Sequence, residues 1–162
     1  MGTFSESYLG RLRQVIGSRL VLMPGCRIVI GNRAGELLLE QRSDFGVWGL
    51  AGGVPEPGES IETAIIREVA EETGLQVRDV RPFGYASDPA HETWTYPNGH
   101  QCQYFSLMFY THAFSGELAA LDGESLQLGW FAPDRLPEML PNMRRAVEAY
   151  MRFRASGEFQ MI

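Results

Sequence analysis

Residues 51–74 constrain the fold more than any other part of this sequence, because a glycine-rich loop is followed by a well-delimited amphipathic helix. Ser60 is a good N-cap, residues 61–73 carry apolar side chains at helical spacing, and Gly74 supplies a C-terminal stop. The loop lacks side chains at its glycines, so its backbone can approach a ligand closely. The segment therefore predicts a helix over 61–73 that begins beside a functional loop.

Glutamates lie where this helix should be apolar. Its buried stripe begins with Ile61 and Ile65. At about 100° per residue, Glu68 and Glu72 continue that stripe and Glu71 flanks it. Unpaired buried charge is costly, and like charges four residues apart repel each other. Carboxylates that converge in this way suit a hard divalent cation such as Mg²⁺. We therefore predict a metal site here, in preference to a solvated acidic face.

The same segment resembles the signature motif of the Nudix hydrolase family, whose members include MutT-like proteins. The resemblance runs over residues 53–75 with no fixed position missing, and Ala51 departs from the proline that is common just before the two glycines. Arg42, Trp48 and residues 129–137 also look like the family. The resemblance implies an α/β (α+β) fold, a Nudix-type α/β/α sandwich with a mixed central sheet, as one domain over residues 1–162.

The resemblance also implies an activity, which is Mg²⁺-dependent (or Mn²⁺-dependent) hydrolysis of the pyrophosphate bond in a nucleoside diphosphate linked to another moiety. It implies that the metal ligands are the Gly52 carbonyl, Glu68, Glu71 and Glu72, and that Glu68 could also act as base. Arg67 and Glu59 are implied to orient these ligands. The catalytic base stays open between Glu68 and Glu124, which lies in a late loop.

Candidate contacts for the rest of the substrate are arginines and aromatic residues. The chain contains no lysine, so Arg27 and Arg42, on strands leading into the loop, are candidates for phosphate or ribose contacts. Trp94 and Tyr96 are candidates for stacking on a base. Pro89 lies near, but not on, the position that resembles ADP-ribose hydrolases, and the tyrosine expected of dinucleoside-polyphosphate hydrolases is absent just beyond it. Together these features favour ADP-ribose or a nucleotide sugar as the expected substrate.

Three other functions remain open at this stage. One is a nucleoside triphosphate pyrophosphohydrolase, and another is a nucleotide-sensing module that binds without turnover. The intact set of glutamates argues against the sensor, because binding alone does not require all of them. The third is an isomerase acting on an allylic diphosphate, for which Cys102 would be the candidate cysteine, with nothing around it that suggests activation.

The remaining elements follow from periodicity and turn residues. A helix is expected at about 4–17, and Asn98-Gly99 predicts a hairpin turn. Strands are expected at 27–30 and 36–40 as a hairpin, then at 47–50, 77–85, 103–111 and 126–131, with a closing helix at 144–153. The first helix could cover this chain's own core or pair with a second copy in a homodimer.

Composition limits the partners. The net charge is −6, with 20 acidic residues against 14 basic ones, and no basic run is present. General nucleic-acid binding and binding to anionic membranes are therefore not expected. The sequence has no apolar stretch near the ~20 residues of a membrane span and no signal-peptide core, so a cytoplasmic location is expected. Cys26 and Cys102 lack zinc-site spacing and should be buried hydrophobic residues.

Overall fold

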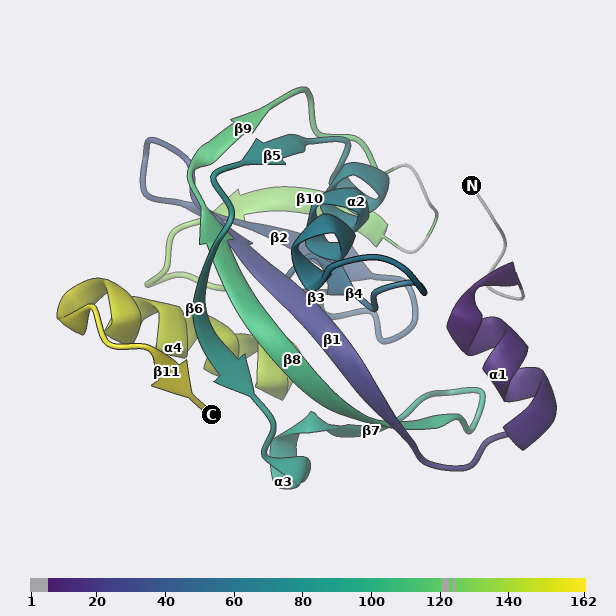
Figure 1. The fold of residues 1–162 in the computed structure, drawn as a ribbon. Helices are drawn as coiled ribbons and strands as arrows, with labels where there is room; N and C mark the ends of the chain where they lie inside the picture. Colours follow the sequence, from purple (N-terminus) through teal and green to yellow (C-terminus); the bar gives the residue numbers. More distant parts are fainter. Residues whose placement is uncertain (1–5, 121–122, 124) are drawn as a thin grey trace.

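The computed structural model describes residues 6–120, 123 and 125–162, and Figure 1 shows a central sheet flanked by helices. The sheet has the strand order β11-β6-β8-β1-β4, with β7 also paired to β8. Its strands are β1 (Val21–Ile30), β4 (Gly52–Gly53), β6 (Arg81–Ala86), β7 (Thr93–Thr95), β8 (Gln101–Thr111) and β11 (Gln160–Met161). Strands β1 and β8 pair in parallel, whereas β8 is antiparallel to β6 and β7, so the sheet is mixed, as predicted.

Each face of the sheet packs against its own helix. Ile28 of β1 belongs to the core formed with α2 (Ile61–Thr73), and the next residue, Val29, belongs to the core formed with α4 (Pro141–Ser156). Successive side chains of a strand point to opposite faces, so one strand contributes to both cores. This arrangement confirms the predicted α/β/α sandwich.

The hairpin expected between residues 27–30 and 36–40 is wrong in its pairing. The connecting turn forms, with the Asn32 N–H donating to the Glu36 carbonyl at 2.9 Å. However, β2 (Leu37–Arg42) leaves the central sheet and pairs with β10 (Ser125–Phe131) and β3 (Trp48–Gly49). The isolated antiparallel bridge Gly31–Leu37 joins the two arms of the turn, while β8 pairs with β1 along its whole length and β4 pairs with it at Cys26 and Arg27.

The strand expected at 77–85 is divided in two. Asp79 adopts a left-handed backbone conformation with φ of 50°, which interrupts an extended strand. Strand β5 (Gln76–Arg78) therefore pairs with β9 (Ala113–Ser115), while β6 continues in the central sheet. The turn predicted at Asn98-Gly99 connects β7 and β8, and Gly99 has φ of 82°.

The predicted helix at 61–73 is confirmed with both of its caps. Ser60 Oγ accepts a hydrogen bond from the Thr63 N–H at 3.1 Å, and Gly74 is left-handed with φ of 75°. Helix α1 (Tyr8–Ile16) is shorter than predicted, and a short helix, α3 (Pro89–Glu92), was not predicted. None of the helices in the described part of the chain is long and apolar enough to cross a membrane.

Candidate functional site

The three glutamates of α2 differ in burial as their positions on the helix predict. Glu72 is 3% exposed, and the exposed fractions of the Glu68 and Glu71 side chains are 17% and 41%. The Glu72 carboxylate accepts a hydrogen bond of 3.0 Å from the Gly52 N–H, which ties the helix to β4. One carboxylate is thus held deep in the fold, and another remains accessible to a ligand.

Burial makes ionisation of the inner carboxylates costly. Desolvation raises the pKa of Glu72 well above its ordinary range, and the neighbouring carboxylates of Glu40 and Glu68 raise it further. Desolvation likewise raises the pKa of Glu68, although the Arg67 guanidinium opposes the shift. A cation bound among these carboxylates would therefore offset a repulsion that is built into the fold.

Glu40 is a residue that sequence reasoning missed. It is 2% exposed on β2, and its Oε2 accepts a hydrogen bond of 2.7 Å from Ser125 Oγ. Its Oε1 lies 3.6 Å from Arg42 Nη1. The signal for Glu40 in the sequence was the apolar run 37–39 directly before it, because such a run predicts a buried strand and burial of its neighbours.

Arg67 connects four parts of the site. Its Nη1 lies 3.1 Å from Glu68 Oε1 and 3.1 Å from Glu71 Oε2, so one cationic group bridges two of the glutamates. Its Nε donates to Glu59 Oε1 at 2.8 Å, and its Nη2 donates to the Val54 carbonyl at 3.2 Å. The hydrogen bonds from Arg67 lower the pKa of Glu59. This geometry suits the orienting role that the sequence resemblance implied for Arg67 and Glu59, and that role remains a prediction.

The two glycines of β4 let the loop pack against the helix. A Cβ atom at Gly53 would overlap the Glu68 carboxylate, and one at Gly52 would overlap the Cys26 carbonyl oxygen. Glycine is therefore required at Gly52, where the neighbour is backbone, whereas a side chain at Gly53 would displace the flexible Glu68 carboxylate. The Gly52 N–H is used by Glu72, while a role for the Gly52 carbonyl as a metal ligand stays a prediction.

The donor types fit a hard divalent cation, although the side chains are not yet arranged around one. Within residues 6–120, 123 and 125–162, no group of three His, Cys, Asp or Glu side chains is close enough to hold a metal ion. Instead, the Arg67 guanidinium provides the positive charge between Glu68 and Glu71. All the candidate ligands are oxygen atoms, which Mg²⁺ and Mn²⁺ prefer.

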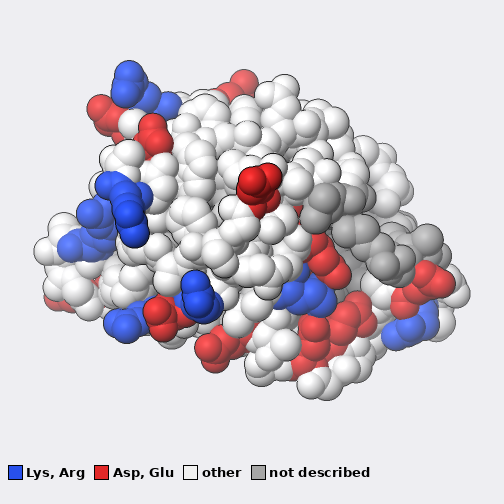
Figure 2. Space-filling model, turned by 90° about the horizontal axis from the view of Figure 1, so that it is seen from above, with Lys and Arg blue, Asp and Glu red and all other residues white. Residues whose placement is uncertain are grey.

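A cavity of about 840 Å³ opens beside these glutamates. This volume lies within the range of small-molecule sites, roughly 300–1,000 Å³. Its walls include Gly52, Gly53, Glu68, Glu71 and Glu72 on the carboxylate side, with residues from α1, β7 and β8. Figure 2 shows acidic side chains beside arginine at more than one place on this face, with uncharged surface between these places.

Both predicted arginines line the cavity but already have protein partners. Arg42 Nε and Nη2 donate to the Asp44 carboxylate at 3.0 and 2.8 Å. Arg27 is 4% exposed, and its Nη2 lies 2.5 Å from Oε2 of the buried Glu92 and 3.0 Å from Ser106 Oγ. Sequence reasoning did not identify Glu92 or Ser106. Direct contacts from the two arginines to substrate remain predictions.

The predicted aromatic residues also line the cavity. The Phe45 ring lies 5.8 Å from that of Trp94 and 5.7 Å from that of Tyr96, measured between centroids. Tyr96 Oη is 2.7 Å from Tyr104 Oη. Their stacking on a base stays a prediction. Glu124, the late-loop candidate for the base, lies outside the described residues.

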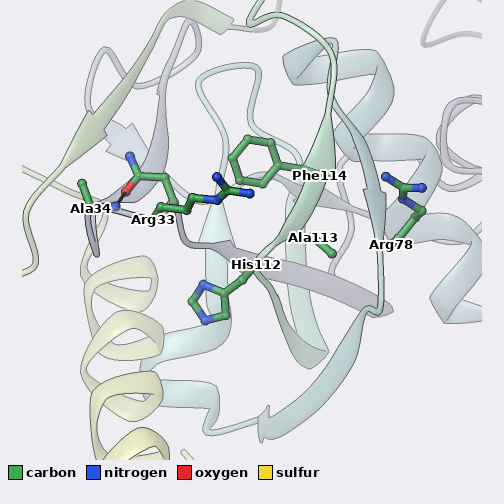
Figure 3. A pocket seen from close by; sticks show the side chains of 7 residues that line it. Arg33, Ala34, Arg78, His112, Ala113 and Phe114 are labelled. Carbon is green, nitrogen blue, oxygen red and sulfur yellow. Dashed lines mark hydrogen bonds between the residues drawn. The ribbon is translucent and has the colours of Figure 1, made fainter.

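A second cavity, of about 580 Å³, lies beyond the other end of β8 and contains none of the predicted site residues. Figure 3 shows Arg33 reaching toward Phe114, with Arg78 extending away on the far side. His112 lines this cavity, but its Nε2 is 3.0 Å from Tyr150 Oη and its Nδ1 is 3.1 Å from the Gly31 carbonyl oxygen. Both of its ring nitrogens are thus engaged in the fold.

Comparisons with known proteins match the chain to one family. The family model described as NUDIX domain matches residues 21–151. A Bacillus subtilis (strain 168) protein, named as a proposed 8-oxo-dGTP diphosphatase, is 30% identical and aligns over 78% of each chain. The NAD-capped RNA hydrolase NudC of Vibrio vulnificus (strain CMCP6) is 33% identical over 72% of this chain, which spans only 41% of that protein. The crystal structure of a MutT NUDIX hydrolase from Burkholderia pseudomallei has 31% identity and a TM-score of 0.67, covering 80% of this chain and 98% of that one.

Proposed function

Because the chain belongs to the Nudix family of hydrolases, which act on pyrophosphate bonds, we propose that it cleaves a nucleoside diphosphate linked to another moiety, with Mg²⁺ or Mn²⁺ as cofactor. The observation that carries this proposal is the set of glutamates on α2 beside a cavity large enough for a nucleotide. Glu68, Glu71, Glu72 and the Gly52 carbonyl would hold the metal. When bound there, it would supply Lewis-acid polarisation of the pyrophosphate.

The chain's own residues prepare the reaction in three ways. Gly52 and Glu72 fix the relative position of the loop and the helix through their hydrogen bond. Arg67 orients Glu68 and Glu71 and is itself held by Glu59. The base that accepts a proton from the attacking water is Glu68 or Glu124. Glu68 is also a proposed metal ligand, and a carboxylate bound directly to a metal is a poorer proton acceptor.

Two classes of substrate are candidates. The sequence resemblance tilts toward ADP-ribose or a nucleotide sugar. The similarity to a B. subtilis protein named for 8-oxo-dGTP, over 78% of each chain, supports a nucleoside triphosphate as the second candidate. A non-catalytic nucleotide sensor is less well supported, because it has no chemical need for a complete set of glutamates.

Phosphorus NMR of product formation tests the proposal. The panel contains ADP-ribose, sugar nucleotides, dinucleoside polyphosphates and nucleoside triphosphates, including 8-oxo-dGTP, each with Mg²⁺. We expect turnover of one class, lost in Glu68→Gln and retained in Glu62→Gln, since Glu62 lies at the start of the same helix and does not line the cavity. Absence of metal-dependent turnover across the panel, with nucleotides still raising the melting temperature, would establish the sensor instead.

A further inference from the structure

Helix α1 precedes the region that the NUDIX family model matches, yet it lines the substrate cavity. The matched region begins at residue 21, whereas α1 is Tyr8–Ile16. Leu9 and Arg13 of this helix are part of the cavity wall. Figure 1 shows α1 outside the layers formed by α2, the sheet and α4. A segment added to the family domain therefore shapes the space where a substrate would bind.

Hydrogen bonds hold α1 against the site at both ends. At its start, the Tyr8 N–H donates to both oxygens of Glu56 at 3.0 and 3.1 Å. The Glu56 N–H in turn donates to Glu59 Oε2 at 2.9 Å, and Glu59 binds Arg67. Further along, Arg13 Nη2 donates to the Gln101 carbonyl at 2.5 Å, across 88 residues of chain. The helix is therefore a fixed wall of the cavity.

Arg13 and Trp94 meet at Cys102. Arg13 Nη2 lies 3.1 Å from Cys102 Sγ, and Trp94 is the direct partner of Cys102 in the antiparallel ladder of β7 and β8. Directly opposed residues in such a ladder project from the same face. Arg13 Nε and Trp94 Nε1 are both buried without a hydrogen-bond partner among the described residues. Buried donors of this kind are costly unless an acceptor reaches them.

The surroundings of this pair suit a nucleobase. The Phe45 ring lies next to those of Trp94 and Tyr96, and all three line the same cavity. A base has two flat faces that pack on aromatic rings and an edge that carries hydrogen-bond acceptors. Arg13 Nη1 and Nη2 already donate to the carbonyls of Gly17, Arg19 and Gln101, so Arg13 holds α1 in place. We propose that α1 and β7 form a nucleobase-specificity wall, in which Leu9 limits the size of the base and the Trp94 indole N–H, uncovered as the base enters, donates a hydrogen bond to its edge. This inference rests on the proposed function, because it requires a nucleotide substrate.

The first experiment changes the size of the wall. ADP-glucose, GDP-glucose, UDP-glucose and CDP-glucose differ only in the base, so the ratio of kcat/KM for purines to that for pyrimidines isolates recognition of the base. We expect Leu9→Trp to lower this ratio about tenfold, since filling a pocket discriminates by at least that factor. Leu9→Ala should lower KM more for the purine substrates than for the pyrimidine substrates, because enlargement favours the larger base.

Leu12→Trp and Leu12→Ala are the matched controls. Leu12 is half-buried on the same helix but does not line the cavity. The controls should leave the ratio unchanged, and circular dichroism shows whether each variant folds. Equal ratios in the Leu9 and Leu12 variants would overturn the proposal. If Leu9→Trp fails to fold, the purine-to-pyrimidine ratios of Leu9→Ala and Leu12→Ala are compared instead, and equal ratios would overturn the proposal.

The second experiment removes one donor and does not depend on turnover. Trp94→Phe keeps an aromatic ring but lacks the N–H, and binding of AMP, GMP, UMP and CMP is measured by calorimetry in EDTA. We expect the Kd of the preferred nucleotide to rise about fivefold to tenfold, as for one lost hydrogen bond. The melting temperature of the ligand-free variant should fall only by the amount expected for the smaller ring packed on Phe45, because the deleted donor has no hydrogen-bond partner among the described residues. An unchanged Kd would overturn the role of Trp94.

The outcomes separate this inference from the proposed function. If the wild type turns over none of the substrates but binds a nucleotide in a Leu9-dependent way, the hydrolase proposal fails and the wall stands. If the wild type turns over a substrate with no dependence on Leu9, the wall fails and the hydrolase stands.

Discussion

Arg27 and Glu92 form a buried ion pair, with Arg27 Nη2 2.5 Å from Glu92 Oε2 although the residues are 65 positions apart in the chain. The exposed fractions of their side chains are 4% and 2%. Arg27→Met would leave the Glu92 charge buried without its partner. We expect a loss of about 3–5 kcal/mol in the free energy of unfolding, measured by urea denaturation.

The double variant Arg27→Met/Glu92→Leu is the test of that explanation. Replacing both charges by apolar groups should recover most of the lost stability. Arg135→Met, which removes a pair with Asp134 that is more than four-fifths exposed, should have no measurable effect. A double variant no more stable than Arg27→Met would show that the charge imbalance is not the cause.

Gly53→Ala should abolish activity without unfolding the protein. Its Cβ would overlap the Glu68 carboxylate and displace it from the site. We expect the metal-dependent kcat/KM to fall at least about a hundredfold, since misplacement of a catalytic group by 1 Å can cost that much. The control is Gly49→Ala, whose Cβ would make ordinary contacts of 3.5 Å and longer. Equal activity in the two variants would contradict the steric argument.

Glu72→Gln should stabilise the metal-free protein at alkaline pH. The folded state raises the pKa of Glu72, so it binds the proton more tightly than the unfolded state does. Stability is then lost as pH rises above the ordinary value of 4.5. The variant removes this cost. Its melting temperature in EDTA should exceed that of the wild type at pH 8, by about 2–4 °C for each kcal/mol gained in the free energy of unfolding. Near pH 4 the two melting temperatures should match.

The same variant should lose Mg²⁺-dependent turnover, so stability and activity change in opposite directions. Glu71→Gln is the control for stability, because that side chain is 41% exposed and should leave the melting temperature unaltered. A lower melting temperature for Glu72→Gln at pH 8 would show that its hydrogen bond from Gly52 outweighs the cost of the buried charge.

Cys26 should resist alkylation in the folded protein. Burial raises the pKa of its thiol to about 11. At pH 8 the reactive thiolate is then about one part in a thousand of the thiol, well below the usual fraction. Peptide mass spectrometry after iodoacetamide treatment should show labelling that rises about tenfold per pH unit between pH 8 and 10. Protein unfolded in urea should react readily at pH 8, and rapid labelling of the folded form at that pH would contradict the prediction.

Local signals in the sequence were sufficient to predict the helix at 61–73 and which of its residues face the core. Ser60 and Gly74 cap the helix as predicted, and Glu72 is buried as its position in the apolar stripe required. The layered architecture and the mixed sheet also followed, because periodicity and the family motif report on them directly. The strand pairing predicted for the hairpin at 27–40 was wrong, since turn residues predict a local reversal but not which strands the returning segment pairs with, here β10 and β3.

The sequence by itself determined the family, the capped helix and the identity of the metal-binding glutamates as candidates, because these depend on residues close together in the chain. Only the tertiary structure placed Glu40 near Glu72, paired Arg27 with Glu92 and set α1 against Glu56. Each of these contacts joins distant segments, and its formation depends on how strands and helices pack together. Such packing has no local signature, and here it decides the shape of the cavity and the charges that face it.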